Sequence, residues 1–336
     1  MISFTPEKLH ARLAAMQGKR IAVLGDFMLD RYLWGSVTRI SPEAPVPVVE
    51  IDNETEHLGG GANVANNIAA LGARPLPIGV IGKDGSGERL SELVRNAGFP
   101  DEGIFIDPDR PTTIKTRVIA HDQHVVRTDR ESRQDLAPAM QEKLLQHLEK
   151  ILPALEAILI EDYNKGVICQ PFLSRVIALA QSRRCLITVD PKFNHFFEYQ
   201  NVTVFKPNRK EAEEVIGMKL ATANDLERAG KILLQRLQCE HVLITLGERG
   251  MALFSQDGSH QVISTRAHHV HDVSGAGDTV IATLTVALAA GADILEAAHL
   301  ANYAAGVVVG EVGAVPIDQQ KLVEAIAHHQ QWEKQV

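Results

Sequence analysis

The residue types best suited to binding an anion lie in one stretch, Asp272-Val273-Ser274-Gly275-Ala276-Gly277-Asp278. An apolar run follows it, so the stretch is predicted to begin a buried helix. The backbone N–H groups of Gly275, Ala276 and Gly277 would have no partner within that helix, and their small side chains would let a phosphate approach. We expect Asp278 to accept a proton, because a helix dipole favours the ionised form of a carboxylate at its N-terminus.

The same residues also fit an ordinary helix start. Asp272 or Ser274 could serve as the N-cap, with the glycines only turning the chain and Asp278 satisfying the first turn. This stretch alone does not separate the two interpretations, so other parts of the chain must decide between them.

A second glycine-rich stretch is Leu58-Gly59-Gly60-Gly61-Ala62-Asn63-Val64-Ala65-Asn66. Its glycines allow backbone amides to approach a ligand, and Asn63 adds a side chain that both donates and accepts hydrogen bonds. A dinucleotide-binding fingerprint does not fit, because residues 52–57 are polar rather than a buried strand and the glycine spacing differs. A glycine-rich turn without a ligand remains the alternative.

Two further stretches are predicted to follow buried strands. In Lys206-Pro207-Asn208-Arg209-Lys210-Glu211, Asn208 and Glu211 fall on the first turn of a helix, which also fits a capping box without function. In Ile244-Thr245-Leu246-Gly247-Glu248-Arg249-Gly250, a strand ends in two glycines. Ligands bind at the carboxyl ends of parallel strands, so both stretches are candidate binding elements.

The composition indicates an enzyme-sized globular protein with small-molecule partners. The chain has 336 residues, of which 45% are hydrophobic, enough to bury a large core. Its net charge of -8 argues against nucleic-acid binding. Three scattered cysteines argue against a disulfide framework or a thiolate metal site, and the histidine group 268, 269 and 271 fits no metal-ligand spacing.

No membrane segment is expected. The first eight residues lack the apolar region of a signal peptide, and the longest apolar run, residues 280–292, contains two threonines and is too short to span a bilayer. Together with the cysteine usage, this predicts a cytoplasmic protein.

The order of elements predicts an α/β fold: a doubly wound, mostly parallel sheet with helices on both faces. Strand-like runs are found at residues 20–25, 74–80, 157–160, 185–189, 202–205 and 241–246. Helical spacing is found at residues 6–16, 61–71, 85–97, 138–152, 171–181, 209–216 and 223–237.

Two segments interrupt this alternation, at about residues 31–51 and 112–128. Both have the half-polar alternation of antiparallel strands, and no helix follows them. We expect them to meet as a small inserted β-sheet that acts as a lid. Because no linker or repeat divides the chain, residues 1–336 are predicted to form a single domain.

The two glycine-rich stretches together resemble the signatures of the ribokinase (PfkB) carbohydrate kinase family. Gly59 to Ala65, with Gly72 and Gly82, resembles the first signature, and Asp272 to Asp278 resembles the second. The resemblance extends from about residue 20 to residue 317, and the ribokinase-like fold that it implies includes an excursion lid. Two sequence departures stand out: Thr283 replaces a usual Ala or Gly, which affects helix packing, and Glu161 replaces a Ser, with no expected effect on the chemistry.

Within this family, three segments resemble the D-glycero-β-D-manno-heptose 7-phosphate kinases of lipopolysaccharide-core biosynthesis: residues 39–48, 162–166 and 190–192. This resemblance implies transfer of the γ-phosphate of ATP to the anomeric C1 hydroxyl, giving the 1,7-bisphosphate. Many such kinases carry a nucleotidyltransferase half downstream, and none follows in this sequence. Another PfkB sugar or nucleoside kinase, and a non-catalytic sugar-phosphate-binding protein, are the alternatives.

The resemblance implies a role for each matching residue. The catalytic base is Asp278, and the anion hole consists of Gly275, Ala276 and Gly277. The residues implied to contact ATP, and Mg²⁺ indirectly, are Asn208, Arg209, Lys210 and Glu211. The nucleotide-binding strand end is implied to consist of Thr245, Gly247 and Gly250. The sugar hydroxyls are implied to be bound by Asp30, Gly60, Gly61 and Asn63.

The substrate phosphate must be met by cations, for which the candidates are Lys165, Lys192, Arg117 and Arg39. Lys192 is the first choice because it follows a predicted strand end at residues 190–191. The alternatives for these residues are solvated charges or lid salt bridges. A monovalent-cation requirement stays open, and a homodimer joined through the lid sheet is expected.

Overall fold

A central sheet of nine strands forms the middle of the protein, in the order β13-β12-β11-β10-β9-β8-β1-β4-β5. The computed structural model describes residues 4–121, 123–266, 273–311 and 315–333. The strands from β11 to β5 pair in parallel, whereas β12 and β13 are antiparallel. Their bounds are β1 Arg20–Gly25, β4 Arg74–Gly82, β5 Ile104–Asp107, β8 Ala157–Glu161, β9 Leu186–Asp190, β10 Val204–Phe205, β11 His241–Thr245, β12 Met251–Ser255 and β13 His260–Ile263.

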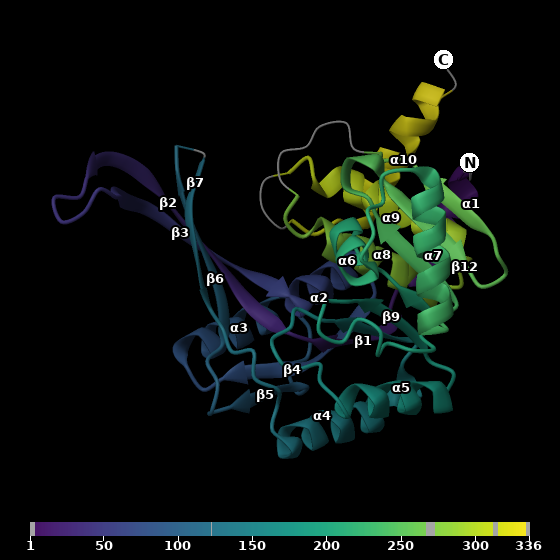
Figure 1. Cartoon of the computed structure of the whole chain (residues 1–336), viewed down its shortest axis with the longest axis horizontal. Coiled ribbons are helices and arrows are strands. Elements are labelled where there is room, and N and C mark those ends of the chain that lie inside the picture. Colours follow the sequence, from purple (N-terminus) through teal and green to yellow (C-terminus); the bar gives the residue numbers. More distant parts are fainter. Residues whose placement is uncertain (1–3, 122, 267–272, 312–314, 334–336) are drawn as a thin grey trace.

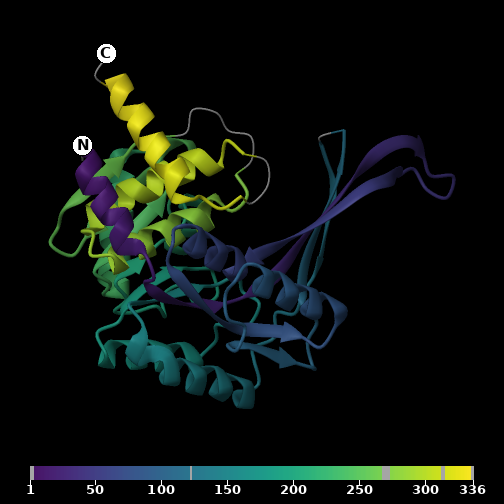
Figure 2. The ribbon, with the colours of Figure 1, turned by 180° about the vertical axis from the view of Figure 1, so that it is seen from behind.

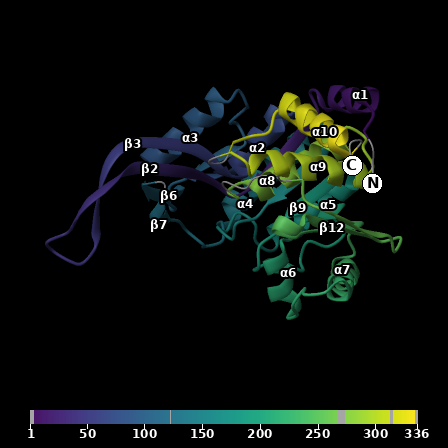
Figure 3. The same cartoon turned by 90° about the horizontal axis from the view of Figure 1, so that it is seen from above.

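Helices cover both faces of this sheet, as the sequence predicted (Figures 1 and 3). One face packs against α1 Pro6–Met16, α2 Gly61–Ala70, α3 Gly85–Asn96, α8 Ala276–Ala289, α9 Ile294–Val308 and α10 Gln319–Glu333. The other packs against α4 Pro138–Ile151, α5 Phe172–Ser182, α6 Arg209–Ile216 and α7 Ala223–Leu237. Side chains of β1 alternate between the two apolar clusters, which explains why this strand is apolar throughout.

Local sequence signals account for several helix boundaries. Thr5 caps α1, with a proline in the first turn, and Asn208 and Glu211 form a complete capping box at α6. Helix α8 is apolar nearly all round and buried along its length, as a helix inside a large protein must be. Thr283, the unusual residue in α8, is accommodated with no exposed surface. In the part of the chain that the structure describes, no helix combines the length and apolarity that crossing a bilayer requires.

A second sheet of four strands projects from the body as a long arm (Figures 1 and 2). Its order is β3-β2-β6-β7, with bounds β2 Phe27–Ile40, β3 Pro47–Gly60, β6 Thr113–Ala120 and β7 Gln123–Arg130. The small second sheet is therefore confirmed, and β2 pairs with β3 and β6 with β7 in the expected antiparallel way. The first excursion is longer than predicted, from residue 27 to residue 60 rather than about 31 to 51, and β2 meets β6 in parallel.

The arm leaves the body at the carboxyl end of β1. Only Asp26 separates β1 from β2, and β3 passes directly into α2 at Gly61, whose N–H donates to the Asp26 carbonyl at 2.9 Å. Gly60 adopts a positive φ of 56°, and a Cβ there would lie 2.5 Å from the same carbonyl, so this turn requires glycine. The arm is thus rooted at the sheet edge where ligands bind in α/β proteins.

Candidate active site

Asp278 lies in the first turn of α8, and only 6% of it is exposed. The helix begins at Gly275, which has a φ of 76° and makes no side-chain cap. Asp272, which could supply a side-chain cap, and the histidines 268, 269 and 271 lie outside the described residues. The Ala276 N–H donates to the Val273 carbonyl at 3.3 Å, and a helix start offers further backbone N–H groups to an acceptor.

Two side chains from distant parts of the sequence hold the Asp278 carboxylate. The Asn63 Nδ2 donates to Oδ2 at 2.7 Å, and the Tyr163 hydroxyl donates to Oδ1 at 2.9 Å. Asn63 lies in the first turn of α2, and Tyr163 follows β8. These two hydrogen bonds fix the orientation of the Asp278 carboxylate, as a general base requires.

Burial, helped by the neighbouring Asp190, raises the pKa of Asp278 to about 6, against the lowering effect of the Asn63 and Tyr163 hydrogen bonds. This shift is opposite in direction to the one expected from the helix dipole, because desolvation penalises the charged form. The carboxylate is still mostly ionised at neutral pH, and a base with a pKa near the working pH is well matched to proton transfer.

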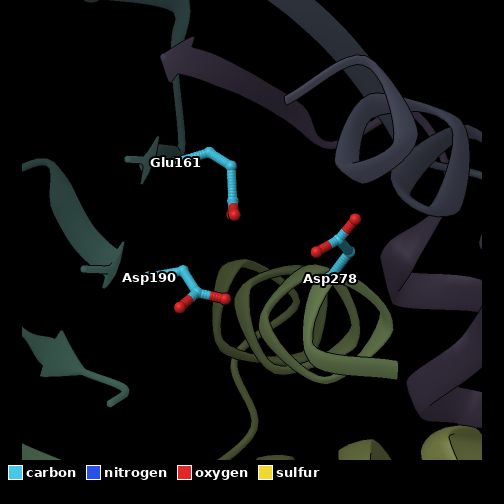
Figure 4. Close-up of side chains that lie close together, drawn as sticks. All are labelled: Glu161, Asp190 and Asp278. Atoms are coloured by element: carbon cyan, nitrogen blue, oxygen red, sulfur yellow. The ribbon is translucent and has the colours of Figure 1, made fainter. Parts of the chain in front are cut away.

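Three buried carboxyl groups face a common space (Figure 4): Glu161 at the end of β8, Asp190 at the end of β9, and Asp278. One oxygen from each lies within 4.8 Å of the others. Burial, followed by Asp190 and Asp278, raises the pKa of Glu161 well above its ordinary value. The buried Glu161 Oε2 also has no hydrogen-bond partner among the described residues. Such a set fits Mg²⁺, which prefers carboxylate oxygens and would relieve this repulsion.

Glu161 was expected to have no effect on the chemistry, and its position shows that expectation to be wrong. It lies beside the base rather than in the surrounding scaffold. Its carboxyl group replaces the hydroxyl of a serine, so it changes the charge of the site directly.

A buried cation faces the first turn of α8. The Lys206 Nζ lies 2.7 Å from Asp190 Oδ2, and Lys206 is 2% exposed. A Cβ added at Gly277 would lie 3.7 Å from this Nζ, so glycine leaves the space between the helix start and the ion pair open. The helix N-terminus and the lysine together favour a bound anion.

Asn208 and Glu211 form the capping box that the sequence offered as their alternative role. Glu211 Oε2 accepts from the Asn208 N–H at 2.8 Å, and its Oε1 accepts from Lys192 Nζ at 2.6 Å. Burial alone lowers the pKa of Lys192, but the carboxylates of Asp190 and Glu211 outweigh burial and raise it above the ordinary value. Lys192, the first choice for the substrate phosphate, is therefore tied to the candidate nucleotide element.

The remaining candidate nucleotide residues differ in position. Thr245 ends β11 and forms a parallel bridge with Asn208, which brings these two elements together. Gly247 and Gly250 both have positive φ, and a Cβ at Gly250 would lie 2.1 Å from the Ile263 carbonyl oxygen. The other two candidates have different surroundings. Arg209 forms an ion pair with Glu213 of its own helix, and Lys210 is exposed.

The candidate sugar residues lie at the root of the arm. Asp30 Oδ1 pairs with Arg117 Nη1 at 2.9 Å, and Lys165 pairs with Glu131 at 2.6 Å. A Cβ at Gly61 would lie 2.5 Å from the Phe27 ring, which gives this glycine a packing role. Arg39 lies at the end of β2 remote from Phe27, exposed and 3.7 Å from Glu50.

Five site residues were not selected from the sequence: Asp26, Glu161, Tyr163, Asp190 and Lys206. Asp26 accepts from the backbone N–H groups of Tyr163 and Lys165 at 2.7 and 3.0 Å, so it shapes the loop that carries Tyr163. A usable signal existed for two of them. Asp190 ends a predicted strand and Lys206 follows one, at the sheet edge where ligands are expected.

The fold is the ribokinase-like α/β fold, and a buried carboxylate stands in the first turn of one of its helices. Residues 19–321 match the family described as "pfkB family carbohydrate kinase". The chain belongs to this family and is an ATP-dependent sugar kinase.

Relatives and solved structures agree with this assignment. The chain is 42% identical over 315 residues to the "Bifunctional protein HldE" of Paramagnetospirillum magneticum, covering 94% of this chain and 64% of the relative. It spans between 61 and 65% of the length of eight such relatives.

Two solved structures share the fold. Phosphofructokinase-2 from Escherichia coli in complex with potassium has a TM-score of 0.75 at 19% identity, covering 94% of this chain and 99% of that one. Ribokinase from Arabidopsis thaliana, complexed with ribose and ATP, has a TM-score of 0.72 at 20% identity, covering 92% and 99%.

Proposed function

We propose that this protein transfers the γ-phosphate of ATP to the anomeric C1 hydroxyl of D-glycero-β-D-manno-heptose 7-phosphate. The product is the 1,7-bisphosphate, a step toward ADP-heptose for lipopolysaccharide core biosynthesis. The observation that carries the catalytic part is the buried Asp278, held by Asn63 and Tyr163 at the start of α8. The sugar assignment is supported by the resemblance of residues 39–48, 162–166 and 190–192 to heptose 7-phosphate kinases, and by the relatives named HldE.

In the proposed reaction, Asp278 accepts the proton of the sugar hydroxyl while that oxygen attacks the γ-phosphorus and ADP leaves. The transition state of phosphoryl transfer is loose, so positioning and neutralisation of charge supply most of the rate. The N–H groups of Gly275, Ala276 and Gly277 are proposed to bind the transferred phosphate, for which the Ala276 N–H would exchange its 3.3 Å bond to the Val273 carbonyl for a phosphate oxygen. Lys206, buried opposite Gly277, adds a positive charge on the same side.

Mg²⁺ bound with ATP would neutralise phosphate charge. Carboxylates that would hold it, directly or through water, are Glu161, Asp190 and Glu211, with Asn208 at the adjoining helix start. Arg209, Lys210, Thr245, Gly247 and Gly250 are proposed to bind the nucleotide. A monovalent-cation requirement is tested by comparing activity in potassium and in a large organic cation.

The proposed sugar site combines Asp30, Asn63, Gly60 and Gly61 with the cations Arg117 and Lys165. Lys192, the first choice from the sequence, is paired with Glu211 at the candidate nucleotide element. Residues 1–336 are proposed to form one kinase domain in which the arm serves as a lid, in a cytoplasmic protein. We also propose a homodimer joined through the arm. Exposed apolar side chains in its strands support this: Ile40, Ile51, Val125 and Val126.

ADP release with a panel of acceptors tests the function: heptose 7-phosphate, ribose, fructose 6-phosphate and adenosine. The highest kcat/KM is expected with heptose 7-phosphate, and phosphorus NMR should place the new phosphate on C1. A higher kcat/KM with another acceptor would assign a different kinase of this family. Binding of the sugar phosphate without ADP release would instead indicate a non-catalytic sensor.

A further inference from the structure

Lys115 occupies the middle of a charged row across the arm. In the sheet register, Lys115 of β6 pairs with Asp30 of β2 on one side and with Asp129 of β7 on the other. Side chains at paired positions lie on one face of a sheet, so the lysine stands between two acids. The next row on this face holds Tyr32, Arg117 and Arg127.

Both acids already have arginine partners from that next row. Asp30 pairs with Arg117 at 2.9 Å, and Asp129 pairs with Arg127 through both carboxylate oxygens at 3.0 and 3.1 Å. Among the residues that the structure describes, none offers the Lys115 ammonium a hydrogen bond or an ion pair. Its contact is with the Tyr163 ring, whose centroid lies 4.8 Å from Nζ.

The surroundings of Lys115 make this lack of a partner costly. The side chain is half-buried. Burial lowers the pKa of its ammonium group and Lys165 lowers it too, against the opposing effects of Asp30 and Asp129. Because those two acids are already paired with arginines, an anion supplied from solution would give the half-buried ammonium the ion pair that it lacks.

The position of Lys115 relative to the base is set by Tyr163. The lysine contacts the ring, and the hydroxyl of the same tyrosine donates to Asp278. One tyrosine side chain therefore separates the ammonium from the base, a separation on the scale of a sugar molecule. The other cations named at the site are neutralised: Lys192 by Glu211, Lys165 by Glu131, Arg117 by Asp30 and Lys206 by Asp190.

We propose that Lys115 binds the phosphate group that the sugar substrate carries at the end remote from the reacting hydroxyl, and so selects phosphorylated over unphosphorylated sugars. This inference rests on the proposed sugar kinase function and assigns a residue to its substrate specificity. An ammonium group and a phosphate dianion form charge-assisted hydrogen bonds, which a neutral hydroxymethyl group cannot replace. Lys192 lies over the same Tyr163 ring, with Nζ 5.2 Å from the centroid, but its ammonium is paired with Glu211 at the candidate nucleotide element.

The test compares the full chain with Lys115→Met and Lys115→Arg, and with Lys143→Met as a control at an exposed lysine of α4. Calorimetry measures Kd for heptose 7-phosphate, for the unphosphorylated heptose and for ATP. Lys115→Met is expected to weaken heptose 7-phosphate binding by roughly tenfold or more, with little change for the other two ligands. Lys115→Arg should restore much of the affinity, and Lys143→Met should match the parent protein.

Equal weakening for the phosphorylated and unphosphorylated sugars, or no weakening for either, would overturn the assignment. Thermal unfolding and ATP affinity show whether a variant is misfolded. If Lys115→Met is misfolded, Lys115→Arg is compared with the parent protein instead. If the parent protein prefers another sugar phosphate, the proposed heptose kinase function is refuted. The role of Lys115 is then tested with that sugar phosphate. A parent protein that phosphorylates only unphosphorylated sugars would refute both.

Discussion

Asn63, at the start of α2, donates a hydrogen bond of 2.7 Å to Asp278, at the start of α8. The two residues lie in the two glycine-rich stretches of the sequence, which are far apart along the chain. Because only the amide nitrogen of Asn63 can donate to a carboxylate, the bond fixes the orientation of both side chains. The two stretches therefore build one site, with the glycines providing close backbone packing around it.

Replacing Asp278 with Asn tests the base. The variant is expected to keep its fold and ATP affinity, because the amide has nearly the same shape, yet turnover should fall by roughly 10²–10⁴-fold. Steady-state kinetics and calorimetry with ATP check both parts. Near-normal turnover would show that Asp278 only satisfies the helix start.

The same variant should be more stable than the parent protein at alkaline pH. In the folded state the pKa of Asp278 is about 6, above its ordinary value of 3.8. The stability it contributes is present below pH 3.8 and is lost as the pH rises through about 6, a loss of about 3 kcal/mol. Urea unfolding should give Asp278→Asn its largest advantage at pH 8 and little at pH 4.5. A variant less stable at pH 8 would contradict the burial cost.

Tyr163→Phe should shift the pH dependence of kcat/KM. The hydroxyl stabilises the ionised form of Asp278, so its loss raises the pKa of the base. Activity of the parent protein is expected to fall below about pH 6, and that decline should begin at higher pH in the variant. Asp26 also has a pKa raised to about 6 by burial and by Asp162. An unshifted profile in the tyrosine variant would assign the decline to Asp26.

Lys192→Ala is expected to act on the nucleotide more than on the sugar phosphate. The sequence placed Lys192 at the substrate phosphate, but its ammonium is held by Glu211 at the start of α6. Affinity for Mg-ATP should fall by roughly tenfold, and heptose 7-phosphate affinity should change less. Calorimetry with each ligand decides, and the opposite pattern would restore the original assignment.

Light scattering at micromolar concentration is expected to give the mass of a dimer. Ile51→Asp in β3 and Val126→Asp in β7 place charges among the exposed apolar side chains of the arm and should yield monomers. The control is Val262→Asp, at an exposed position in β13 of the central sheet. A monomeric parent protein would refute association through the arm.

The fold class could be predicted because the alternation of strands and helices is a local signal. Strands buried on both faces, such as β1 and β8, are apolar throughout, and α6 carries its own capping box. The extent of the arm could not be predicted in the same way. The outer part of β3 is exposed and polar, so its pattern does not differ from that of a loop.

The site was predicted where a motif marks it and missed where only the tertiary structure does. Asp278 and Asn63 stand in glycine-rich stretches, whereas Tyr163 joins them only because β8 ends beside α8. The partners of a charged side chain are also set by the fold. Nothing in the spacing of residues 192 and 211 indicates that these two side chains pair, and their pairing removes Lys192 from the set of free cations.

Asp26 stands where the arm leaves the body, and its contacts join the arm to the loop that carries Tyr163. Its carbonyl accepts from Gly61, at the other root of the arm, while its carboxylate gathers the N–H groups of Tyr163, Lys165 and Val167. A swing of the arm about this root would therefore pull on the loop whose tyrosine holds the base. Closure of the arm over a substrate would then also change the basicity of Asp278, because both depend on the buried carboxylate of Asp26.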